Sequence, residues 1–184
     1  MSSPSDTYKT IGVLVGRDLV GDALIKLPFL RALRNAWPAA EISWITSQGP
    51  TAFAGQLREP TQALINNIYE KPEWLRTHGA PDSGSGLHEL MSLARQVLNP
   101  RARPEMLSDA PHFDLLIDTR NRWREAIHAR KVPHRLFLSP AMHFIFSDRR
   151  PPFLGSRPQH LCDQLLELVQ LAAGILPPST GALP

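Results

Sequence analysis

The stretch IGVLVGRDLVGDALIKLPFLRALRNAW, residues 11–37, contains the strongest fold signal in this sequence. Its first six residues, 11–16, form a short β-branched apolar run that ends in glycine, which is typical of a strand buried on both faces of a parallel sheet. Residues 22–37 then place apolar side chains at helical spacing until Pro38, so a helix is expected there, bent or restarted at Pro28. A strand followed at once by a helix indicates the start of an α/β domain.

The same alternation of strands and helices continues along the chain. Further strands are expected over residues 41–47, 63–70, 113–118 and 134–138. Further helices are expected over residues 87–98, 121–131 and 159–173. The pattern predicts a Rossmann-like α/β fold, an open, doubly wound parallel sheet with helices on both faces and ligands at the carboxyl ends of the strands. We expect a disordered N-terminus over residues 1–10, one domain over 11–174 and a linker over 175–184.

The composition excludes several classes of protein. The chain has 184 residues, of which 42% are hydrophobic and 20% charged, as in a single soluble globular domain. Its net charge of +3 is too small a surplus for a nucleic-acid-binding face. The single Cys162 excludes an intramolecular disulfide, and the histidines are scattered, so no metal site is expected. No apolar run approaches the ~20 residues that span a bilayer, and the cytoplasm is the expected location.

The loop after the first strand lacks both common phosphate-binding glycine motifs. Gly16 and Gly21 have the spacing of a P-loop, but Asp22 and Ala23 stand where that motif needs a Lys and a Ser or Thr. The glycines of this stretch do not match G-x-G-x-x-G either. What remains is an R-x-x-x-G-D sequence, from Arg17 to Asp22, at the start of the helix.

Three blocks of the chain resemble the family 9 glycosyltransferases, the ADP-heptose:lipopolysaccharide heptosyltransferases. The first is residues 16–46, and its matching positions are Arg17, Gly21, Asp22, Pro28, Leu30, Leu33, Pro38, Ala40 and Ile42. The second, FDLLIDTRNRWREAIHARKVPHRLF at 113–137, resembles the family's later strand and loop, although the usual glycine beside Asn121 is missing. The third, RPQHLCDQLLELVQLAAG at 157–174, resembles the helix that closes the family's first domain, with His160 as its leading residue.

The resemblance implies a GT-B architecture, in which two Rossmann-like domains face each other across a cleft. This chain matches the N-terminal, acceptor-binding domain, and a donor-binding domain does not fit within its length. The implied reaction is inverting transfer of heptose from ADP-heptose to an anionic acceptor of the Kdo and lipid A type, with no cofactor. The implied partners are the nucleotide-sugar donor, the lipopolysaccharide-core acceptor and a separate donor-domain chain, with peripheral contact at the cytoplasmic face of the inner membrane. The isolated chain is expected to be inactive.

The resemblance assigns the general base to Asp22, and the same motif makes Gly21 and Arg17 candidates for substrate binding. The residues alone also allow Asp22 to be a helix N-cap. The Arg17 guanidinium matches carboxylate or phosphate oxygens of an acceptor, but it could equally be a surface side chain. Lys26 lies one turn beyond Asp22, so it could pair with that carboxylate, reach the acceptor or belong to a solvated helix face.

A basic cluster follows the strand at 113–118. Its members are Arg120, Arg122, Arg124, Arg130, Lys131 and Arg135. Such a cluster suits an acceptor that carries carboxylates and phosphates, and it also suits an ordinary solvated helix with Glu125 in local ion pairs. Arg120 is the best single candidate because it is closest to the strand end, and Asn121 and Arg122 are candidates beside it.

Two other functions remain open from the sequence. The missing second domain and the missing glycine near Asn121 also fit a truncated, non-catalytic α/β module that binds an anionic glycan or a partner chain. A nucleotide-binding Rossmann domain is a weaker alternative, because both glycine motifs fail.

Overall fold

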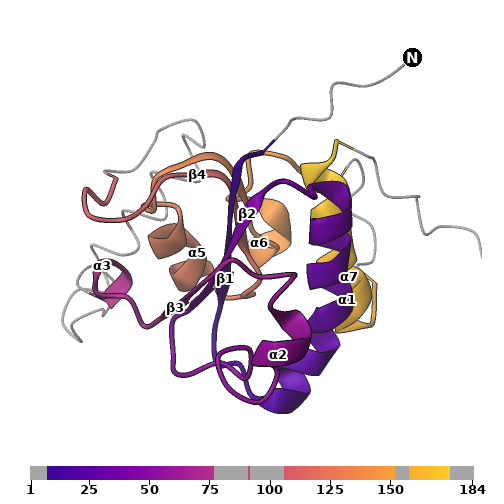
Figure 1. Ribbon diagram of the computed structural model, residues 1–184. Coiled ribbons are helices and arrows are strands. Elements are labelled where there is room, and N and C mark those ends of the chain that lie inside the picture. The colour runs from indigo at the N-terminus through magenta and orange to yellow at the C-terminus, as the bar shows by residue number, and fades with distance from the viewer. Residues whose placement is uncertain (1–7, 77–90, 92–105, 152–157, 175–184) are drawn as a thin grey trace, which may run out of the picture.

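The computed structural model describes residues 8–76, 91, 106–151 and 158–174. Over these residues the chain forms a five-stranded sheet of order β3-β2-β1-β4-β5, in which every neighbouring pair is parallel (Figure 1). The strands are β1 Thr10–Val15, β2 Glu41–Thr46, β3 Asn67–Glu70, β4 Phe113–Asp118 and β5 His134–Leu138. The predicted fold class, an open Rossmann-like parallel sheet, is confirmed.

The first strand, β1, lies at the centre of the sheet and is buried from Ile11 to Val15. Ile11 pairs with Ile42 of β2 on one side and with Leu115 of β4 on the other. Successive side chains of a strand point to opposite faces of the sheet, and helices cover both faces. The side chains from Ile11 to Val15 are therefore removed from water, which explains the continuous apolar run. Gly12 leaves room for its neighbours, since a Cβ atom there would lie 2.9 Å from Cδ1 of Leu116.

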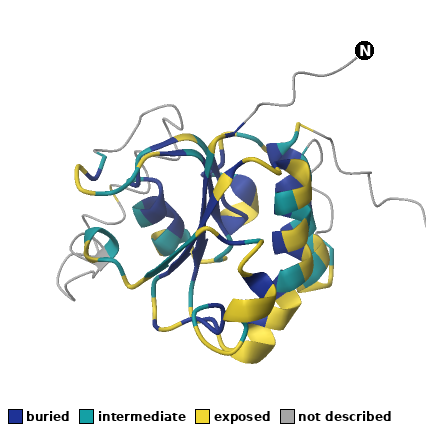
Figure 2. Ribbon diagram, viewed as in Figure 1, coloured by how far each residue is buried: buried dark blue, intermediate teal, exposed yellow. Residues whose placement is uncertain are grey.

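Helices lie on both faces of the sheet, as Figure 1 shows. The helix α1 (Val20–Ala36) packs against α7 (Leu161–Ala172) on one face, and α5 (Trp123–Ala129) lies on the other. Three short helices complete the described part, namely α2 (Arg58–Thr61), α3 (Glu73–Arg76) and α6 (Ala141–Phe144). The strands β1, β2 and β4 are the most deeply buried elements, the edge strand β3 is only partly buried, and the helices are exposed on their outer sides (Figure 2).

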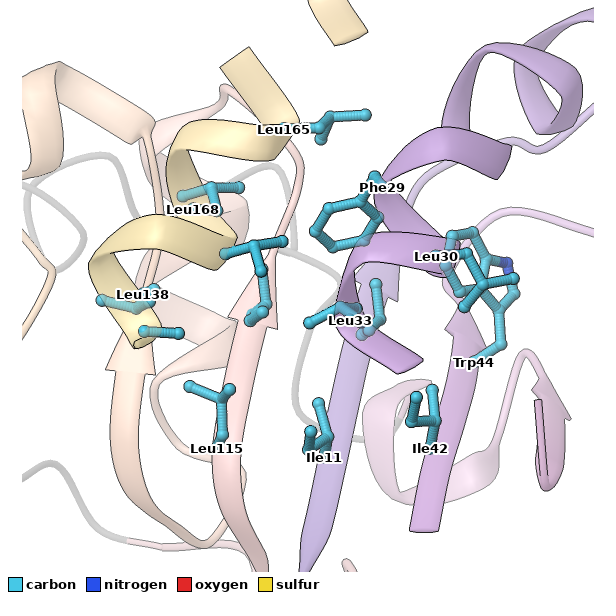
Figure 3. Close-up of a cluster of buried hydrophobic side chains, with 14 of the residues drawn as sticks. Ile11, Phe29, Leu30, Leu33, Ile42, Trp44, Leu115, Leu138, Leu165 and Leu168 are labelled. Atoms are coloured by element: carbon cyan, nitrogen blue, oxygen red, sulfur yellow. The ribbon is translucent and has the colours of Figure 1, made fainter. Parts of the chain in front are cut away.

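Two hydrophobic cores hold these layers together. In the first, Phe29 and Leu33 of α1 meet Leu165 and Leu168 of α7 above Ile11 (Figure 3). The second core lies on the α5 side, and its members include Leu14, Ile45, Leu116, Ala126 and Phe137.

The helix α1 runs without interruption through Pro28, so the restart that the sequence allowed there does not occur. Proline removes the N–H that would bond to the carbonyl of Leu24, four residues earlier. Both Leu24 and Pro28 are exposed, so the unpaired carbonyl lies on the solvent side, where water can bind it.

The expected disordered N-terminus is too long. Tyr8 is 2% exposed, its hydroxyl donates to the Ala172 carbonyl at 3.0 Å, and its ring contacts Trp37 edge-on at 5.2 Å between centroids. β1 begins at Thr10, so residues 8–10 belong to the domain. The other part of that prediction, residues 1–7, lies outside the described residues.

Three other predicted segments differ from the structure or fall outside its description. The third strand begins at Asn67 rather than at residue 63, because the N–H groups of Leu64 and Ile65 bond to the Thr61 carbonyl and continue the turn after α2. The linker at 175–184 lies outside the described residues. So does the helix expected over 87–98, apart from Met91.

Candidate functional site

The carboxyl ends of the parallel strands meet at one edge of the sheet, which is where an open α/β fold binds its ligands. β1 lies between β2 and β4, so the loop after β1 lies between the loops after those two strands. The first predicted group, Arg17, Gly21 and Asp22, follows β1, and the second, Asn121 and Arg122, follows β4. All five are exposed. The fold therefore brings the two predicted groups to adjacent loops of one edge.

Asp22 lies in the first turn of α1 and is not the N-cap of that helix. The N-cap is Leu19, whose side chain makes no capping hydrogen bond. Asp22 is the third helical residue, it is exposed, and its carboxylate forms no hydrogen bond or ion pair with any residue that the structure describes. The capping interpretation is therefore wrong, and a free carboxylate stands at the positive end of the helix dipole.

Asp18 is a buried carboxylate in the same loop, and sequence reasoning missed it. It is 1% exposed and accepts three side-chain hydrogen bonds. The donors are Lys26 Nζ at 2.6 Å, Thr51 Oγ1 at 2.6 Å and the Trp44 indole at 3.0 Å. The backbone carbonyl of Asp18 also accepts from the Ala52 N–H at 3.1 Å. Asp18 thus joins the loop after β1 to α1, to β2 and to the loop after β2.

Lys26 therefore belongs to the interior and not to a solvated helix face. It is 8% exposed and pairs with Asp18, not with Asp22 as one interpretation expected. Helical spacing contained this signal, because Lys26 lies three residues after Ala23 and four before Leu30, both of which are fully buried. A charged side chain on an apolar helix face requires a buried partner, and Asp18 was available in the preceding loop.

A second buried carboxylate, Asp118, ends β4 and holds Arg120. The distance from Arg120 Nε to Asp118 Oδ1 is 2.6 Å, and the Arg120 N–H donates to the same oxygen at 3.2 Å. Burial raises the pKa of Asp118 above its usual value, and Arg120 partly offsets this rise. The other oxygen accepts from Ser139 Oγ at 3.4 Å. Asp118 thereby joins the loops after β4 and β5.

The Arg120 guanidinium is engaged within the protein. Besides Asp118 it contacts Glu125. The Oε2 atom of Glu125 lies 3.6 Å from Arg120 Nε, and the backbone carbonyl of Glu125 accepts a hydrogen bond from Arg120 Nη2 at 3.2 Å. Glu125 also accepts a 3.3 Å hydrogen bond from Gln48, in the loop after β2. Arg120 therefore organises this edge, and Asn121 and Arg122 are the exposed groups of its loop.

The six basic residues expected as one cluster are dispersed by α5. This helix leads from the carboxyl edge of the sheet back to the amino edge, where the N–H of Phe113 bonds to the Pro133 carbonyl. Arg130, beyond the end of α5, is 5% exposed and donates to the Phe146 carbonyl at 2.9 Å. Arg124 stacks on the Trp123 ring at 5.1 Å. The interpretation as one acceptor-binding patch is wrong.

The turn after β5 has an unusual backbone. Met142, His143 and Phe144 have φ values of 49°, 55° and 62°, in the left-handed region, and none of them is glycine. Each such residue costs about 1–2 kcal/mol in an L-amino-acid chain. Met142 and His143 are exposed, while Phe144 is 2% exposed and belongs to the first core. The turn stands at the same edge as the predicted site residues.

An open groove of about 540 Å³ lies beside β3, α2 and the loop after β2. Its lining includes Phe53, Arg58, Ile65 and Glu70. None of the residues predicted to bind substrate lines it.

Neither a membrane span nor a metal cluster occurs in the described ranges. No helix there is long and apolar enough to cross a bilayer. No group of three or more His, Cys, Asp or Glu side chains there is arranged to hold a metal ion.

No protein-family model matches the sequence, and no curated protein matches it significantly. Solved structures do match. Escherichia coli heptosyltransferase WaaC with ADP-2-deoxy-2-fluoro heptose is 18% identical, with a TM-score of 0.53 over 94% of this chain and 51% of that one. WaaC with ADP is 17% identical, with a TM-score of 0.53 over 94% of this chain and 50% of that one.

A family 9 glycosyl transferase from Veillonella parvula is 18% identical, with a TM-score of 0.49 over 89% of this chain and 41% of that one. The chain thus spans about half the length of the structures it matches. At this level of identity the likeness concerns the fold. The chain has the Rossmann-like fold of the GT-B glycosyltransferases, and the region that it matches is about half the length of WaaC.

Proposed function

We propose that this chain is the acceptor-binding half of a family 9 glycosyltransferase, with Asp22 as its general base. The observation that carries the proposal is the exposed, unpaired Asp22 carboxylate at the carboxyl edge of the sheet. It lies in a helix that is anchored to the sheet through the pair of Lys26 and Asp18. The likeness to WaaC in fold and the R-x-x-x-G-D motif support the same assignment.

The proposed reaction is inverting transfer of heptose from ADP-heptose to an acceptor of the Kdo and lipid A type. The acceptor oxygen attacks the anomeric carbon and forms the new glycosidic bond. The bond to ADP breaks on the opposite face, and ADP leaves with the electron pair. Asp22 accepts the proton of the attacking hydroxyl, which is the role of a general base. A donor-binding half, in the same protein or in a separate chain, would hold ADP-heptose.

Exposed cations in the loops after β1 and β4 suit an acceptor that carries acidic groups. Arg17 precedes α1 and Arg122 precedes α5, and both are exposed. A guanidinium binds a carboxylate or phosphate through paired hydrogen bonds, and each such bond contributes about 1.5–3 kcal/mol. In this proposal both arginines bind the acceptor, and Arg120 keeps the loop of Arg122 in place through Asp118 and Glu125.

A lipid-linked acceptor would bring the protein to the cytoplasmic face of the inner membrane. The start of α1 exposes four large apolar side chains beside Asp22, namely Leu19, Val20, Leu24 and Ile25. Apolar side chains of this kind suit contact with a lipid-linked substrate. Vesicle co-sedimentation with and without the acceptor lipid tests this peripheral contact.

The decisive test is calorimetric titration of the chain with a deacylated lipid A saccharide that carries Kdo. We expect saturable binding that weakens about tenfold or more in Arg17→Ala and in Arg122→Ala. Lys9→Ala is the matched control, because Lys9 is an exposed cation just before β1, at the opposite edge of the sheet. Unchanged affinity in both arginine variants would contradict the proposed site.

Gly21→Ala and Asp22→Asn separate binding from chemistry. A Cβ atom at Gly21 meets no protein atom within 4 Å, so weaker binding in Gly21→Ala would report contact with the ligand itself. Asp22→Asn should keep acceptor affinity and abolish transfer in a protein that also contains a donor-binding half. Retained transfer would show that Asp22 is not the base. Binding without transfer in every assembled form would instead favour a non-catalytic glycan-binding module.

A further inference from the structure

The turn after β5 retains a strained backbone where glycine would relieve it. Met142 and His143 have φ and ψ near 50°, and Phe144 continues with φ of 62°. L-residues rarely adopt this conformation, whereas glycine adopts it without a steric penalty. Strain of this kind persists where the surrounding structure enforces it, and it is concentrated at ligand-binding and catalytic sites.

Hydrogen bonds fix both ends of this turn. The N–H of Ser139 donates to Ser147 Oγ at 2.7 Å, and that hydroxyl donates to the Ser139 carbonyl at 2.7 Å. The N–H of Ser147 donates to the Phe144 carbonyl at 3.0 Å. The buried Phe144 ring anchors the turn to the first core. The turn is therefore held in place from both sides.

The anchored turn exposes the side chains of Met142 and His143 at the carboxyl edge of the sheet, where the proposed site lies. Met142 is 46% exposed and His143 is exposed, although Ala141 and Phe144 on either side of them are buried. The same network extends to the loop after β4, because Ser139 Oγ bonds to Asp118, which holds Arg120. α6 also packs against α5, whose N-cap is Arg122. The turn thus packs against the helix that follows the loop of Arg122.

We propose that Met142 and His143 contact the bound acceptor saccharide directly and determine its specificity. The Met142 thioether and methylene groups suit the C–H face of a sugar ring, and the His143 imidazole can donate to or accept from a hydroxyl group. The inference rests on the proposed function, since it deepens the acceptor site already described. The strained backbone is then the means by which both side chains are held toward the ligand.

The test measures stability and binding in the same variants, using the deacylated Kdo-containing lipid A saccharide as the probe. His143→Gly relieves the strain and removes the imidazole, so its melting temperature should rise by about 2 °C while its affinity falls about tenfold. His143→Ala keeps the strain and removes the imidazole, so its affinity should fall with no rise in melting temperature. Met142→Gly should behave as His143→Gly does.

Two control variants test whether the effects depend on the position of the turn. One relieves a left-handed backbone elsewhere, and the other removes a histidine elsewhere. Lys71 also has a left-handed φ, of 46°, and follows β3, the strand farthest from β5. Lys71→Gly should raise the melting temperature and leave affinity unchanged. His112, exposed before β4 at the amino edge, gives a histidine control in His112→Ala.

A more stable His143→Gly variant with unchanged affinity would overturn the inference and leave the proposed function standing. An unchanged melting temperature in His143→Gly would overturn the role of strain. Failure of the unsubstituted chain to bind the probe would overturn the proposed function, and this inference with it.

Discussion

Two buried carboxylates, Asp18 and Asp118, organise the edge of the sheet where the candidate site lies. Each accepts a hydrogen bond from a cation in the segment that follows it, Lys26 of α1 or Arg120 of the loop after β4, and another from a hydroxyl group after a neighbouring strand. The exposed candidates, Asp22 and Arg122, lie near these carboxylates in sequence but are not paired to them. The buried residues therefore fix the loops, and the exposed residues remain available for a ligand.

The pair of Lys26 and Asp18 should contribute strongly to stability. Lys26→Met leaves the Asp18 carboxylate buried without its cation, so we expect a loss of about 3–5 kcal/mol in the free energy of unfolding, measured by urea denaturation. Asp22→Asn is the matched control and should cost less than about 1 kcal/mol, because Asp22 is exposed and unpaired. Adding Asp18→Asn to Lys26→Met should recover part of the loss, and a further loss would contradict a charge-pair origin.

Asp118 should make stability depend on pH in a defined direction. Its pKa is raised in the folded state, so between the unfolded and folded pKa values the native protein binds more protons than the unfolded chain. The free energy of unfolding should therefore fall as pH rises through the folded pKa of Asp118. Asp118→Asn removes this titration. Urea denaturation of both proteins between pH 4 and pH 8 should show a steeper fall in the unsubstituted chain, and parallel pH profiles would contradict the assignment.

At the residue scale, the position of the motif in the fold could be predicted from the sequence, but burial and pairing could not. Arg17, Gly21 and Asp22 lie at the carboxyl edge, as expected for the loop and helix that follow the first strand, and their roles in binding and catalysis stay predictions. Asp18 has the same side chain as Asp22 and lies four residues away, and only tertiary packing against Trp44 and Thr51 makes it a buried acceptor. Local ion pairs with Glu125 were one interpretation of the basic cluster, but the buried pair of Arg120 with Asp118 was not foreseen.

At the scale of elements, four of the five strands were predicted to within one residue at each end. β4 and β5 have the predicted bounds, β2 ends one residue earlier than predicted, and β1 is shifted by one residue at both ends. β3 was predicted too long, because local turn hydrogen bonds after α2 override a weak apolar pattern. The basic cluster failed for a related reason: α5 separates residues that are close in sequence.

Two glycines of the β1–α1 unit should respond to alanine in opposite directions. In Gly12→Ala the new methyl group would lie 2.9 Å from Leu116 Cδ1 and 3.0 Å from the Phe113 ring, so we expect a loss of about 1–3 kcal/mol. Gly21→Ala adds a methyl group in open space within α1 and should gain about 0.5–1 kcal/mol. Thermal denaturation measures both, and equal shifts of the same sign would contradict the packing described for Gly12.

At the scale of the whole molecule, the sheet joins two cores that face opposite layers of helices. Val13 and Leu14 are adjacent in β1, yet Val13 belongs to the core of α1 and α7, and Leu14 to the core of α5. A perturbation on one face is therefore transmitted through the shared strands. We infer that the two layers unfold together.

Leu168→Ala tests this coupling. Leu168 of α7 is fully buried in the first core, so its truncation should cost about 2–5 kcal/mol. If both layers form one cooperative unit, the urea midpoint should fall equally when it is followed by tryptophan fluorescence and by far-ultraviolet circular dichroism. Separate midpoints would show that the two layers unfold independently.

The indole N–H of Trp44 can serve as a spectroscopic probe of the loop after β1. Trp44 is fully buried, and its N–H donates to the Asp18 carboxylate that ties the loop after β1 to the sheet. Its indole proton should therefore exchange slowly with solvent and give a distinct nuclear magnetic resonance signal. Because that signal depends on the Asp18 contacts, it reads out whether the loop that presents Asp22 keeps its shape when a ligand binds.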